Sequence, residues 1–388
     1  MTSAKPRIAL DLSCAAESPV TGIGYAAINQ VKALLAGDSA FAYASFATGD
    51  RQGGAVLRRE LGMLHHRVLP FARLAKYHLW TRWSWPPIEW FSGDVRIAHN
   101  FCHQTPATRN ALKLVTIHDL SFIRVPETHT ETTIRVQSRL LKQCVEEADA
   151  LIAVSNHCKS ELIELLGIDA ARVHVVPNGV NLEEFEKPFD PQEHARLARR
   201  VGLTRDYLIQ IGTLEPRKNI LRLLEAYGVA RSRHPHSHSP QLLLVGKMGW
   251  KSGPIAEAIA SRTSGADVIH AGYLNRSEAV LLLRGARACL YPSLYEGFGL
   301  PVLEAMAAGI PVVTSAVSAL PEVAGGTCTL VDPYDVESIA SAICSVMDNE
   351  EAAARLAAAA RERARTLTWE TSASALEKVY CQVAGMPV

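Results

Sequence analysis

Residues 291–311 read YPSLYEGFGLPVLEAMAAGIP, and this stretch decides the expected fold of the second half of the chain. The apolar run that ends at Tyr291 is typical of a buried parallel strand. Gly297 and Gly299 form a glycine-rich turn after it, and residues 302–308 favour a helix. The order strand, turn, helix predicts a βα unit whose turn and helix start offer backbone N–H groups to an anion such as phosphate.

Two glutamates stand eight positions apart in this stretch, Glu296 in the turn and Glu304 in the helix. A carboxylate at a phosphate-binding turn would repel the phosphate, so we expect Glu296 to face a neutral donor such as a sugar hydroxyl. Glu304 can accept both hydroxyls of a ribose. The two glutamates together suggest a nucleotide-sugar site.

Length and composition limit the class of protein. The 388 residues exceed one ordinary core and fit two domains of about 150–200 residues. A net charge of +1 with 20% charged residues gives no bulk basicity for nucleic acid. We see no secretory signal, no run of the roughly 18 apolar residues that span a bilayer, and no C-x-x-C pair among the eight cysteines. A cytoplasmic protein is expected.

Short apolar runs alternate with helical patterns along the whole chain, which indicates an α/β fold. We expect two Rossmann-like, doubly wound domains facing an inter-domain cleft, with the boundary in the polar segment 183–202. The expected parts are an N-terminal acceptor-side domain (1–198), a C-terminal donor domain (199–368) and a C-terminal helix (369–388) packing back toward the first domain. Ser155, Asn219 and Asn275 are expected to cap helices. Expected strands are 7–11, 41–46, 95–98, 114–117, 151–154, 173–176, 207–211, 242–245, 268–269, 289–291, 311–314 and 329–331.

The loop Gly212-Thr-Leu-Glu-Pro-Arg-Lys-Asn219 follows the first strand of the second half. Gly212 allows a ligand to approach the backbone. Arg217 and Lys218 place two cations at a helix start, where they can stabilise the charge that develops on a diphosphate leaving group. The alternative is that both are solvated surface charges.

This loop, the segment Glu296-Gly-Phe-Gly-Leu-Pro301 with its second glutamate, and Pro177-Asn-Gly-Val-Asn181 resemble the retaining family-4 glycosyltransferases of the GT-B fold. Thr21-Gly-Ile-Gly24 and Ile117-His-Asp-Leu120 are most similar to segments of bacterial mannosyltransferases that assemble surface polysaccharides such as O-antigen and capsule. The resemblance covers nearly the whole chain.

The resemblance implies a role for each matching residue. Glu296 would hold hydroxyls of the donor sugar, Glu304 the ribose, and Arg217 and Lys218 the diphosphate. His118 would lie near the reaction centre. The implied catalytic residues are His118, Arg217, Lys218 and Glu296, and the implied donor-binding residues are Gly24, Gly212, Arg217, Lys218, Glu296, Gly297, Phe298, Gly299, Leu300 and Glu304.

Other interpretations of the N-terminal residues stay open. Gly22-x-Gly24 could begin a dinucleotide fingerprint with Ala27 in the third position, although no acidic residue clearly ends a second strand. His118 and Asp119 follow an expected strand at the edge where ligands collect. His118 could instead be a hydrogen-bonded structural histidine, and Asp119, a candidate acceptor residue, could cap the next turn.

The expected mechanism needs no metal or other cofactor. The family has no agreed nucleophile, so the resemblance implies front-face substitution, in which the acceptor hydroxyl enters on the side from which the diphosphate leaves. The sequence holds no D-x-D motif to bridge a metal to the donor. His234-Pro-His-Ser-His238 could ligate a metal, but a solvated loop is the favoured interpretation.

Residues 76–91 hold four of the six tryptophans, Trp80, Trp83, Trp85 and Trp90, within a basic region. Such residues suit an anionic membrane interface, where lipid-linked acceptors reside. We expect peripheral contact with the inner leaflet or an acceptor site that includes Trp80 and Trp83. The alternative is that the tryptophans pack a loop onto the domain.

The leading function is therefore transfer of a hexose, with mannose from GDP-mannose as the first choice, to a glycan or lipid-linked acceptor. dTDP-rhamnose and UDP-sugars are alternative donors. A GT-B nucleotide-sugar epimerase is the rival from another class. A PLP-dependent phosphorylase is a third interpretation, but no segment suggests its Schiff-base lysine.

Overall fold

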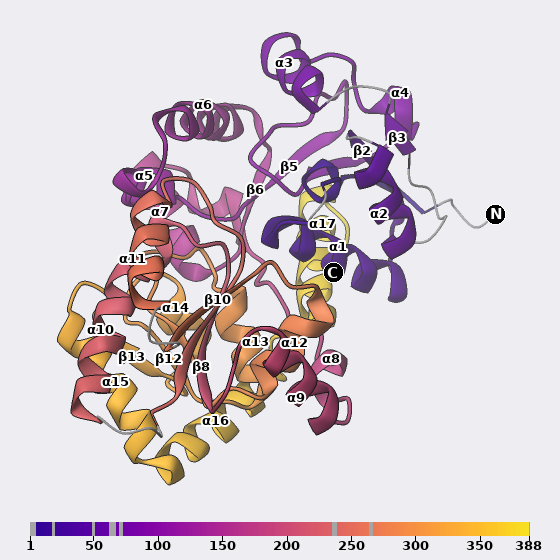
Figure 1. Ribbon diagram of the computed structural model, residues 1–388. Coiled ribbons are helices and arrows are strands. Elements are labelled where there is room, and N and C mark those ends of the chain that lie inside the picture. Colours follow the sequence, from indigo (N-terminus) through magenta and orange to yellow (C-terminus); the bar gives the residue numbers. More distant parts are fainter. Residues whose placement is uncertain are drawn as a thin grey trace. The chain divides into compact units, whose positions relative to one another are not determined.

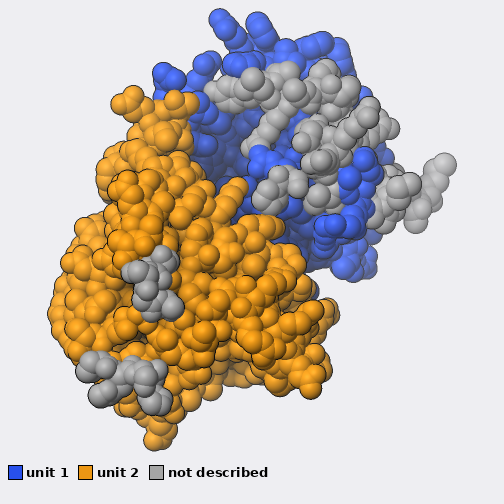
Figure 2. Space-filling model, in the orientation of Figure 1, with its two compact units in different colours: residues 1–120, 135–179, 367–388 blue, residues 121–134, 180–366 orange. Residues whose placement is uncertain are grey.

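The computed structural model describes residues 5–17, 20–48, 51–61, 67–69, 73–234, 239–263 and 267–387. The chain divides into two compact units, which Figure 2 shows in blue and orange. Unit 1 consists of residues 1–120, 135–179 and 367–388, and unit 2 of residues 121–134 and 180–366. The division after Gly179 precedes the polar segment in which the boundary near residue 198 is expected, so that segment belongs to unit 2.

Unit 1 is built on a seven-stranded parallel sheet in the order β3-β2-β1-β4-β5-β6-β7. The order reverses between β1 and β4, which is the doubly wound arrangement expected from the sequence. Short, buried, apolar sequences such as ALIA in β6 form these strands. The strands are β1 (Arg7–Asp11), β2 (Ala42–Thr48), β3 (Arg67–Leu69), β4 (Ile97–Asn100), β5 (Leu112–Ile117), β6 (Ala150–Ala153) and β7 (Val173–Val175).

Local residues cap both ends of the helix that follows β6 in unit 1. Ser155 accepts a hydrogen bond from Cys158 N, as predicted, and Gly167 ends the same helix in the left-handed region at φ +64°. The C-terminal α17 packs against α1 (Figure 1), and its Leu376 and Tyr380 belong to the same hydrophobic core as β1. The helices are α1 (Gly22–Ala36), α2 (Arg51–Leu61), α3 (Arg73–Trp83), α4 (Glu89–Ser92), α7 (Asn156–Leu166) and α17 (Trp369–Ala384), with short 3-10 turns η1 (Ser13–Ala15) and η3 (Ala170–Arg172).

Unit 2 repeats the plan with a six-stranded parallel sheet in the order β10-β9-β8-β11-β12-β13. The order reverses between β8 and β11, so the loops that follow these two strands lie at the switch point where α/β proteins bind ligands. The strands are β8 (Tyr207–Ile211), β9 (Gln241–Val245), β10 (Val268–Gly272), β11 (Ala288–Tyr291), β12 (Val312–Ser315) and β13 (Thr329–Val331).

The two predicted asparagine caps of unit 2 differ in outcome. Asn275 forms a full capping box with Glu278. Asn219 occupies the N-cap position of α10 but has φ +60° and no capping hydrogen bond. Its Oδ1 accepts from Arg222 at 3.1 Å instead, and its Nδ2 donates to the carbonyls of Pro292 and Pro333. The helices are α8 (Glu183–Glu186), α9 (Pro191–Arg200), α10 (Ile220–Arg233), α11 (Gly253–Thr263), α12 (Arg276–Arg284), α13 (Leu300–Ala308), α14 (Leu320–Ala324), α15 (Val336–Asp348) and α16 (Glu350–Ala364), with the 3-10 turn η4 (Pro216–Lys218).

One segment of the first half belongs to unit 2. Residues 121–134 contain α5 (Ser121–Arg124), η2 (Pro126–Thr128) and the first turn of α6 (Glu131–Glu147), which continues into unit 1. Across the described residues, no helix combines the length and the apolar character needed to cross a membrane.

Candidate functional site

The loops after β8 and β11 form the candidate donor site of unit 2. The loop after β8 begins at Gly212, whose φ of +140° favours glycine, and Gly212 N donates to Val245 O at 2.9 Å. The loop after β11 carries Glu296. Leu294 N donates to Arg217 O at 2.9 Å, which fixes the two loops to each other. The parallel strand order alone brings these two loops to one edge.

A buried cluster of charges occupies this edge. Arg217 Nη1 lies 2.9 Å from Glu296 Oε2, and Lys218 Nζ lies 2.5 Å from Glu296 Oε1. Lys218 also donates to the hydroxyl of Tyr291 at 2.5 Å, and Arg217 pairs with Glu215 at 2.8 Å. Lys218 is only 8% exposed and Glu296 7%. The interpretation of Arg217 and Lys218 as solvated surface charges is therefore wrong.

Burial and neighbouring charges set the ionisation of the cluster. Burial opposes ionisation of Glu296, but Arg217 and Lys218 outweigh it and hold its pKa below the ordinary value. Burial, with Arg217, lowers the pKa of Lys218, although Glu296 counteracts both. Burial raises the pKa of Glu215. Glu296 holds Arg217 and Lys218 next to each other in a site that is already largely shielded from water. An incoming anion can therefore bind them with little further loss of hydration of the two cations.

The carboxylate of Glu296 is held by cations of the neighbouring loop. In this structure both carboxylate oxygens face cations rather than a neutral donor, because the loop after β8 delivers Arg217 and Lys218 to the same edge as the glycine turn. The backbone N–H of Glu296 is also held, by Ser318 Oγ at 3.0 Å. The role of Glu296 toward a sugar hydroxyl stays a prediction.

The glycine turn is shaped by packing on its far side. Gly299 has φ +102°, and a Cβ there would lie 2.6 Å from Leu320 Cδ2. Phe298 is buried, Leu300 begins α13, and Gly297 precedes them in the same turn. The turn therefore presents backbone rather than side chains at the helix start, which is the geometry that suits an anion or a sugar oxygen.

Glu304 lies in α13 and pairs with a residue that the sequence did not single out. Arg276, the first residue of α12, donates to Glu304 Oε1 at 2.6 Å and to Glu184 Oε2 at 2.6 Å. Burial raises the pKa of Glu304, although Arg276 counteracts it. Arg276 thereby fixes the orientation of Glu304 and favours its charged, hydrogen-bond-accepting form.

His118 follows β5 in unit 1 and is held as a neutral imidazole. Its Nε2 donates to Phe101 O at 2.8 Å, and its backbone N–H donates to His103 Nε2 at 3.1 Å. Burial lowers the pKa of His118 to about 4, and His103 acts in the same direction. Because Nε2 carries the proton, Nδ1 has the lone pair and can accept a hydrogen bond from a hydroxyl.

Gly24 lies in the first turn of α1, and Asp119 follows closely on the end of β5. A Cβ at Gly24 would lie 2.9 Å from Cys14 O, so glycine there allows the start of α1 to approach η1. Its N–H is bonded to Thr21 Oγ1 at 3.3 Å. Asp119 counteracts the fall in the pKa of His118. The roles of Gly24 toward a phosphate and of Asp119 toward an acceptor stay predictions.

Both halves of the chain match models of known protein families. Residues 41–184 match the family model described as Glycosyltransferase Family 4, and residues 193–363 match Glycosyl transferases group 1. The O-antigen chain mannosyltransferase B of Escherichia coli is 32% identical over 262 residues, covering 66% of this chain and 67% of that protein. Glycogen synthase of Mycobacterium tuberculosis is 32% identical over 337 residues, covering 84% of this chain and 76% of that protein.

The chain belongs to the family-4 glycosyltransferases. A solved structure agrees on the fold: Anabaena HepE in complex with UDP-glucose superposes with a TM-score of 0.73 at 17% identity, over 97% of this chain and 99% of that chain. The predicted GT-B fold is thereby confirmed, as is the prediction that the protein is a glycosyltransferase.

The tryptophan-rich region of the glycosyltransferase is only partly exposed. Trp80 is 2% exposed, and its Nε1 donates to Pro86 O at 3.2 Å, so it cannot present its ring to a membrane or an acceptor as predicted. Lys76, counted in the basic region, is buried against Asp11. Trp83 is 64% exposed, and Trp85 and Trp90 are also exposed.

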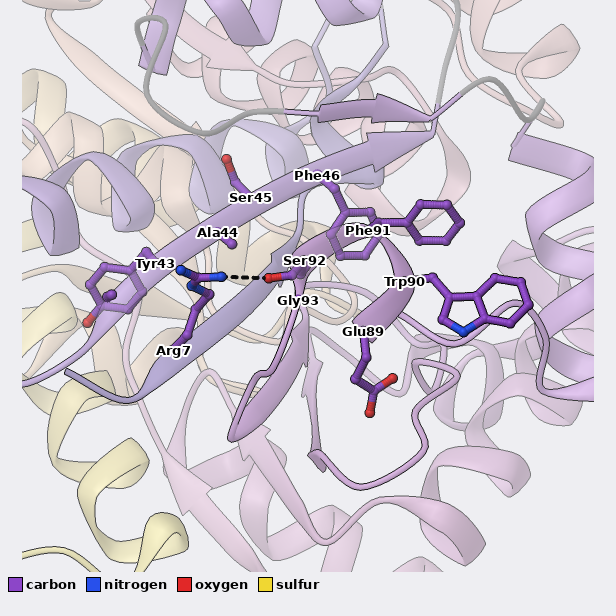
Figure 3. Close-up of a pocket in the computed structure, with 11 residues that line it drawn as sticks. Arg7, Tyr43, Ala44, Ser45, Phe46, Glu89, Trp90, Phe91, Ser92 and Gly93 are labelled. Carbon is purple, nitrogen blue, oxygen red and sulfur yellow. Dashed lines mark hydrogen bonds between the residues drawn. The ribbon is translucent and has the colours of Figure 1, made fainter. Parts of the chain in front are cut away.

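Unit 1 of the glycosyltransferase contains a pocket of about 470 Å³, which Figure 3 shows. It is lined by the start of β2 and by α4, and Arg7 crosses it to donate to Ser92 O at 3.0 Å. Glu89 points away from β2 and accepts hydrogen bonds from the backbone N–H groups of residues 109–111. None of the predicted site residues lines this pocket.

The histidine tract of the glycosyltransferase lies mostly outside the described residues, which exclude His236 and His238. His234 lies 3.5 Å from Asp348. Within the described ranges, no group of three His, Cys, Asp or Glu side chains is placed to hold a metal ion. Independence from metal stays a prediction.

Proposed function

We propose that this glycosyltransferase moves a hexose, with retention of configuration, from a nucleotide-sugar to a hydroxyl of a glycan or lipid-linked acceptor. GDP-mannose is the proposed donor, and mannose is the transferred sugar. The observation that carries the proposal is the pair of buried cations, Arg217 and Lys218, at the switch point of unit 2 beside a glycine turn and two glutamates. The similarity to an O-antigen mannosyltransferase supports mannose as the sugar.

Binding of the diphosphate would rearrange the charge cluster. Glu296 neutralises Arg217 and Lys218. A diphosphate carries more negative charge than one carboxylate, so it competes for both cations. Glu296, released in part from them, can then accept hydroxyls of the donor sugar, with the N–H groups of Phe298 and Gly299 beside it. Glu304, held by Arg276, accepts the ribose hydroxyls.

The proposed chemical step is a front-face substitution. The bond between the anomeric carbon and the diphosphate oxygen breaks as the acceptor oxygen bonds to the same face of that carbon. The departing phosphate oxygen takes the proton of the acceptor hydroxyl. Arg217 and Lys218 stabilise the charge that grows on the diphosphate, a contribution that commonly reaches a few kcal/mol for one preorganised donor. His118 Nδ1 accepts a hydroxyl hydrogen bond of the sugar near the reaction centre.

UDP-sugars are the alternative donors that specific observations favour. HepE, whose fold this chain shares, is described in complex with UDP-glucose. dTDP-rhamnose stays within the same class. A GT-B epimerase would change the sugar of the donor with no acceptor present, whereas a transferase gives at most slow hydrolysis.

We place the protein in the cytoplasm, with peripheral contact to the inner leaflet through exposed Trp83, Trp85 and Trp90. A basic side chain beside one of these tryptophans supports membrane contact: the Arg109 guanidinium lies 5.4 Å from the centre of the Trp90 ring. Basic and aromatic side chains together favour an anionic interface.

The test is a panel of GDP-mannose, dTDP-rhamnose, UDP-glucose and UDP-galactose, read by calorimetry and by release of nucleoside diphosphate with and without a polyprenyl-linked glycan. The proposal predicts binding of GDP-mannose and release that depends on the acceptor. Change of the sugar in donor-only incubations would establish an epimerase instead.

A further inference from the structure

The segment 121–134, called here the crossover segment, starts three residues after His118. It belongs to unit 2, while His118 and the strand β5 that carries it belong to unit 1. The chain returns to unit 1 within α6, so the crossover segment is covalently tied to unit 1 at both ends. Contacts that hold the crossover segment in unit 2 therefore restrict the path of the backbone that follows His118.

Trp250 and Lys251 hold the crossover segment. The indole Nε1 of Trp250 donates to Thr128 O at 2.7 Å, and Lys251 Nζ donates to Glu127 O at 2.9 Å. The Trp250 ring stacks on His129 with centroids 5.6 Å apart and planes 25° apart. His129 is buried, and its Nε2 is bonded to Ser121 Oγ at 2.9 Å. The contacts thus extend back to the first residue of the segment.

The same loop is joined to the loop of the diphosphate cations. Leu214 N donates to Lys247 O at 2.9 Å, and Gly249 N donates to Leu214 O at 2.9 Å. A Cβ at Gly246 would lie 2.0 Å from Gly212 O, and one at Gly249 would lie 2.8 Å from Thr213 Cγ2. Two glycines are therefore needed for the loop 246–251 to approach the loop 212–218 this closely.

We propose that Trp250 is a positioning residue that couples the diphosphate loop to His118 through the crossover segment. The proposal rests on the roles proposed above for Arg217, Lys218 and His118. Lys251 adopts φ +50°, a conformation that is costly for lysine. Such a conformation persists only where the surrounding structure imposes it, which indicates that the loop 246–251 is held in place. A displacement of the diphosphate loop on donor binding is transmitted to Thr128 and so to the chain that leaves His118.

Two variants and a matched control test the coupling. Trp250→Phe keeps the stacking on His129 but loses the hydrogen bond to Thr128, and Trp250→Ala loses both. Phe189→Ala is the control: Phe189 is 38% exposed against 37% for Trp250, and it likewise packs on a histidine of unit 2, His194, at 5.3 Å. Trp250→Ala is expected to lower kcat by about tenfold or more, because small misplacements of a reacting group have large effects on rate.

Affinity for GDP or UDP should stay within about twofold in both Trp250 variants, because the cations are untouched. Phe189→Ala should change neither quantity. An unchanged kcat in Trp250→Ala overturns the coupling, as does an equal loss in Phe189→Ala. A purely structural role would lower the thermal midpoint of Trp250→Ala but leave kcat unchanged when it is measured well below that midpoint.

A ligand-free measurement separates this proposal from the proposed function. In protein with labelled histidines, assigned with His118→Gln, the ring signals of His118 are compared among the variants by NMR, alongside amide exchange in the crossover segment. Faster exchange in residues 121–134 with a shifted His118 signal in Trp250→Ala supports the coupling even if no nucleotide-sugar binds. An unshifted His118 signal overturns it even if transfer is observed.

Discussion

Replacement of Glu296 by glutamine tests the charge cluster most sharply. The amide keeps the shape of the side chain but removes the negative charge that lies 2.9 Å from Arg217 and 2.5 Å from Lys218. Loss of one partner of a buried ion pair costs about 3–5 kcal/mol, and we take about 3 kcal/mol because the amide oxygen still accepts one hydrogen bond. For a unit of this size, that corresponds to a fall of roughly 6–12 °C in the thermal midpoint.

Nucleoside diphosphate should reverse this loss. With Glu296 neutral, the pairing of Arg217 with Glu215 stays, and a diphosphate supplies the negative charge that the two cations have lost. A carboxylate about 5 Å from a phosphate charge repels it by about 3 kcal/mol at an effective dielectric constant of 20, and the glutamine variant removes this repulsion. Its affinity for GDP or UDP should therefore be equal to or greater than that of the wild type, while transfer is lost.

The assay is thermal unfolding with and without saturating nucleoside diphosphate, together with calorimetry and a transfer assay. At a concentration 100 times the dissociation constant, binding stabilises the folded protein by about 2.7 kcal/mol, which nearly cancels the deficit of the variant. A thermal midpoint equal to that of the wild type, or an affinity more than tenfold weaker, would refute the reasoning about Glu296.

Four further outcomes follow from the structure. Glu304→Ala should weaken nucleotide binding. Arg276→Gln should make nucleotide binding fall more steeply as the pH is lowered, because it removes the cation that counteracts the raised pKa of Glu304. Calorimetry at several pH values checks both outcomes. The folded state keeps His118 neutral until about pH 4, whereas the unfolded chain takes up the proton near pH 6.5. Stability is therefore lost as the pH falls through this window, and His118→Gln should flatten the loss in urea unfolding measured from pH 7 to pH 4. The double variant Trp83→Ala/Trp90→Ala should release the protein from anionic vesicles in flotation assays; equal retention of variant and wild type would contradict membrane contact, and neutral vesicles serve as the control.

The sequence predicted the sheets well because parallel strands buried on both faces leave continuous apolar runs. Strands such as β1, β8 and β13 have their predicted bounds. The three-residue β3 was missed, since so short a run has no readable period. The capping box at Asn275 was found because it is a local pattern, whereas the long-range hydrogen bonds of Asn219 have no local signal.

The site was only partly predictable, for the same reason. Local motifs pointed to Arg217, Lys218 and Glu296, but not to the ion pairs among them, which depend on the strand order. Arg276 belongs to no recognised motif, and the sequence around it does not mark it as the partner of Glu304. Tryptophan composition alone could not separate buried Trp80 from exposed Trp83, because both lie in the same helix, α3.

Retaining transfer from a nucleotide-sugar is the central claim, and the anomeric configuration of the product tests it most directly. The enzyme is incubated with GDP-mannose and a polyprenyl-linked glycan, and the one-bond carbon–hydrogen coupling at the new anomeric centre is measured by NMR. Retention predicts a single transferred α-mannose, because the sugar of GDP-mannose has the α configuration. A β-linked product, or a donor whose sugar is altered with no acceptor present, would contradict it.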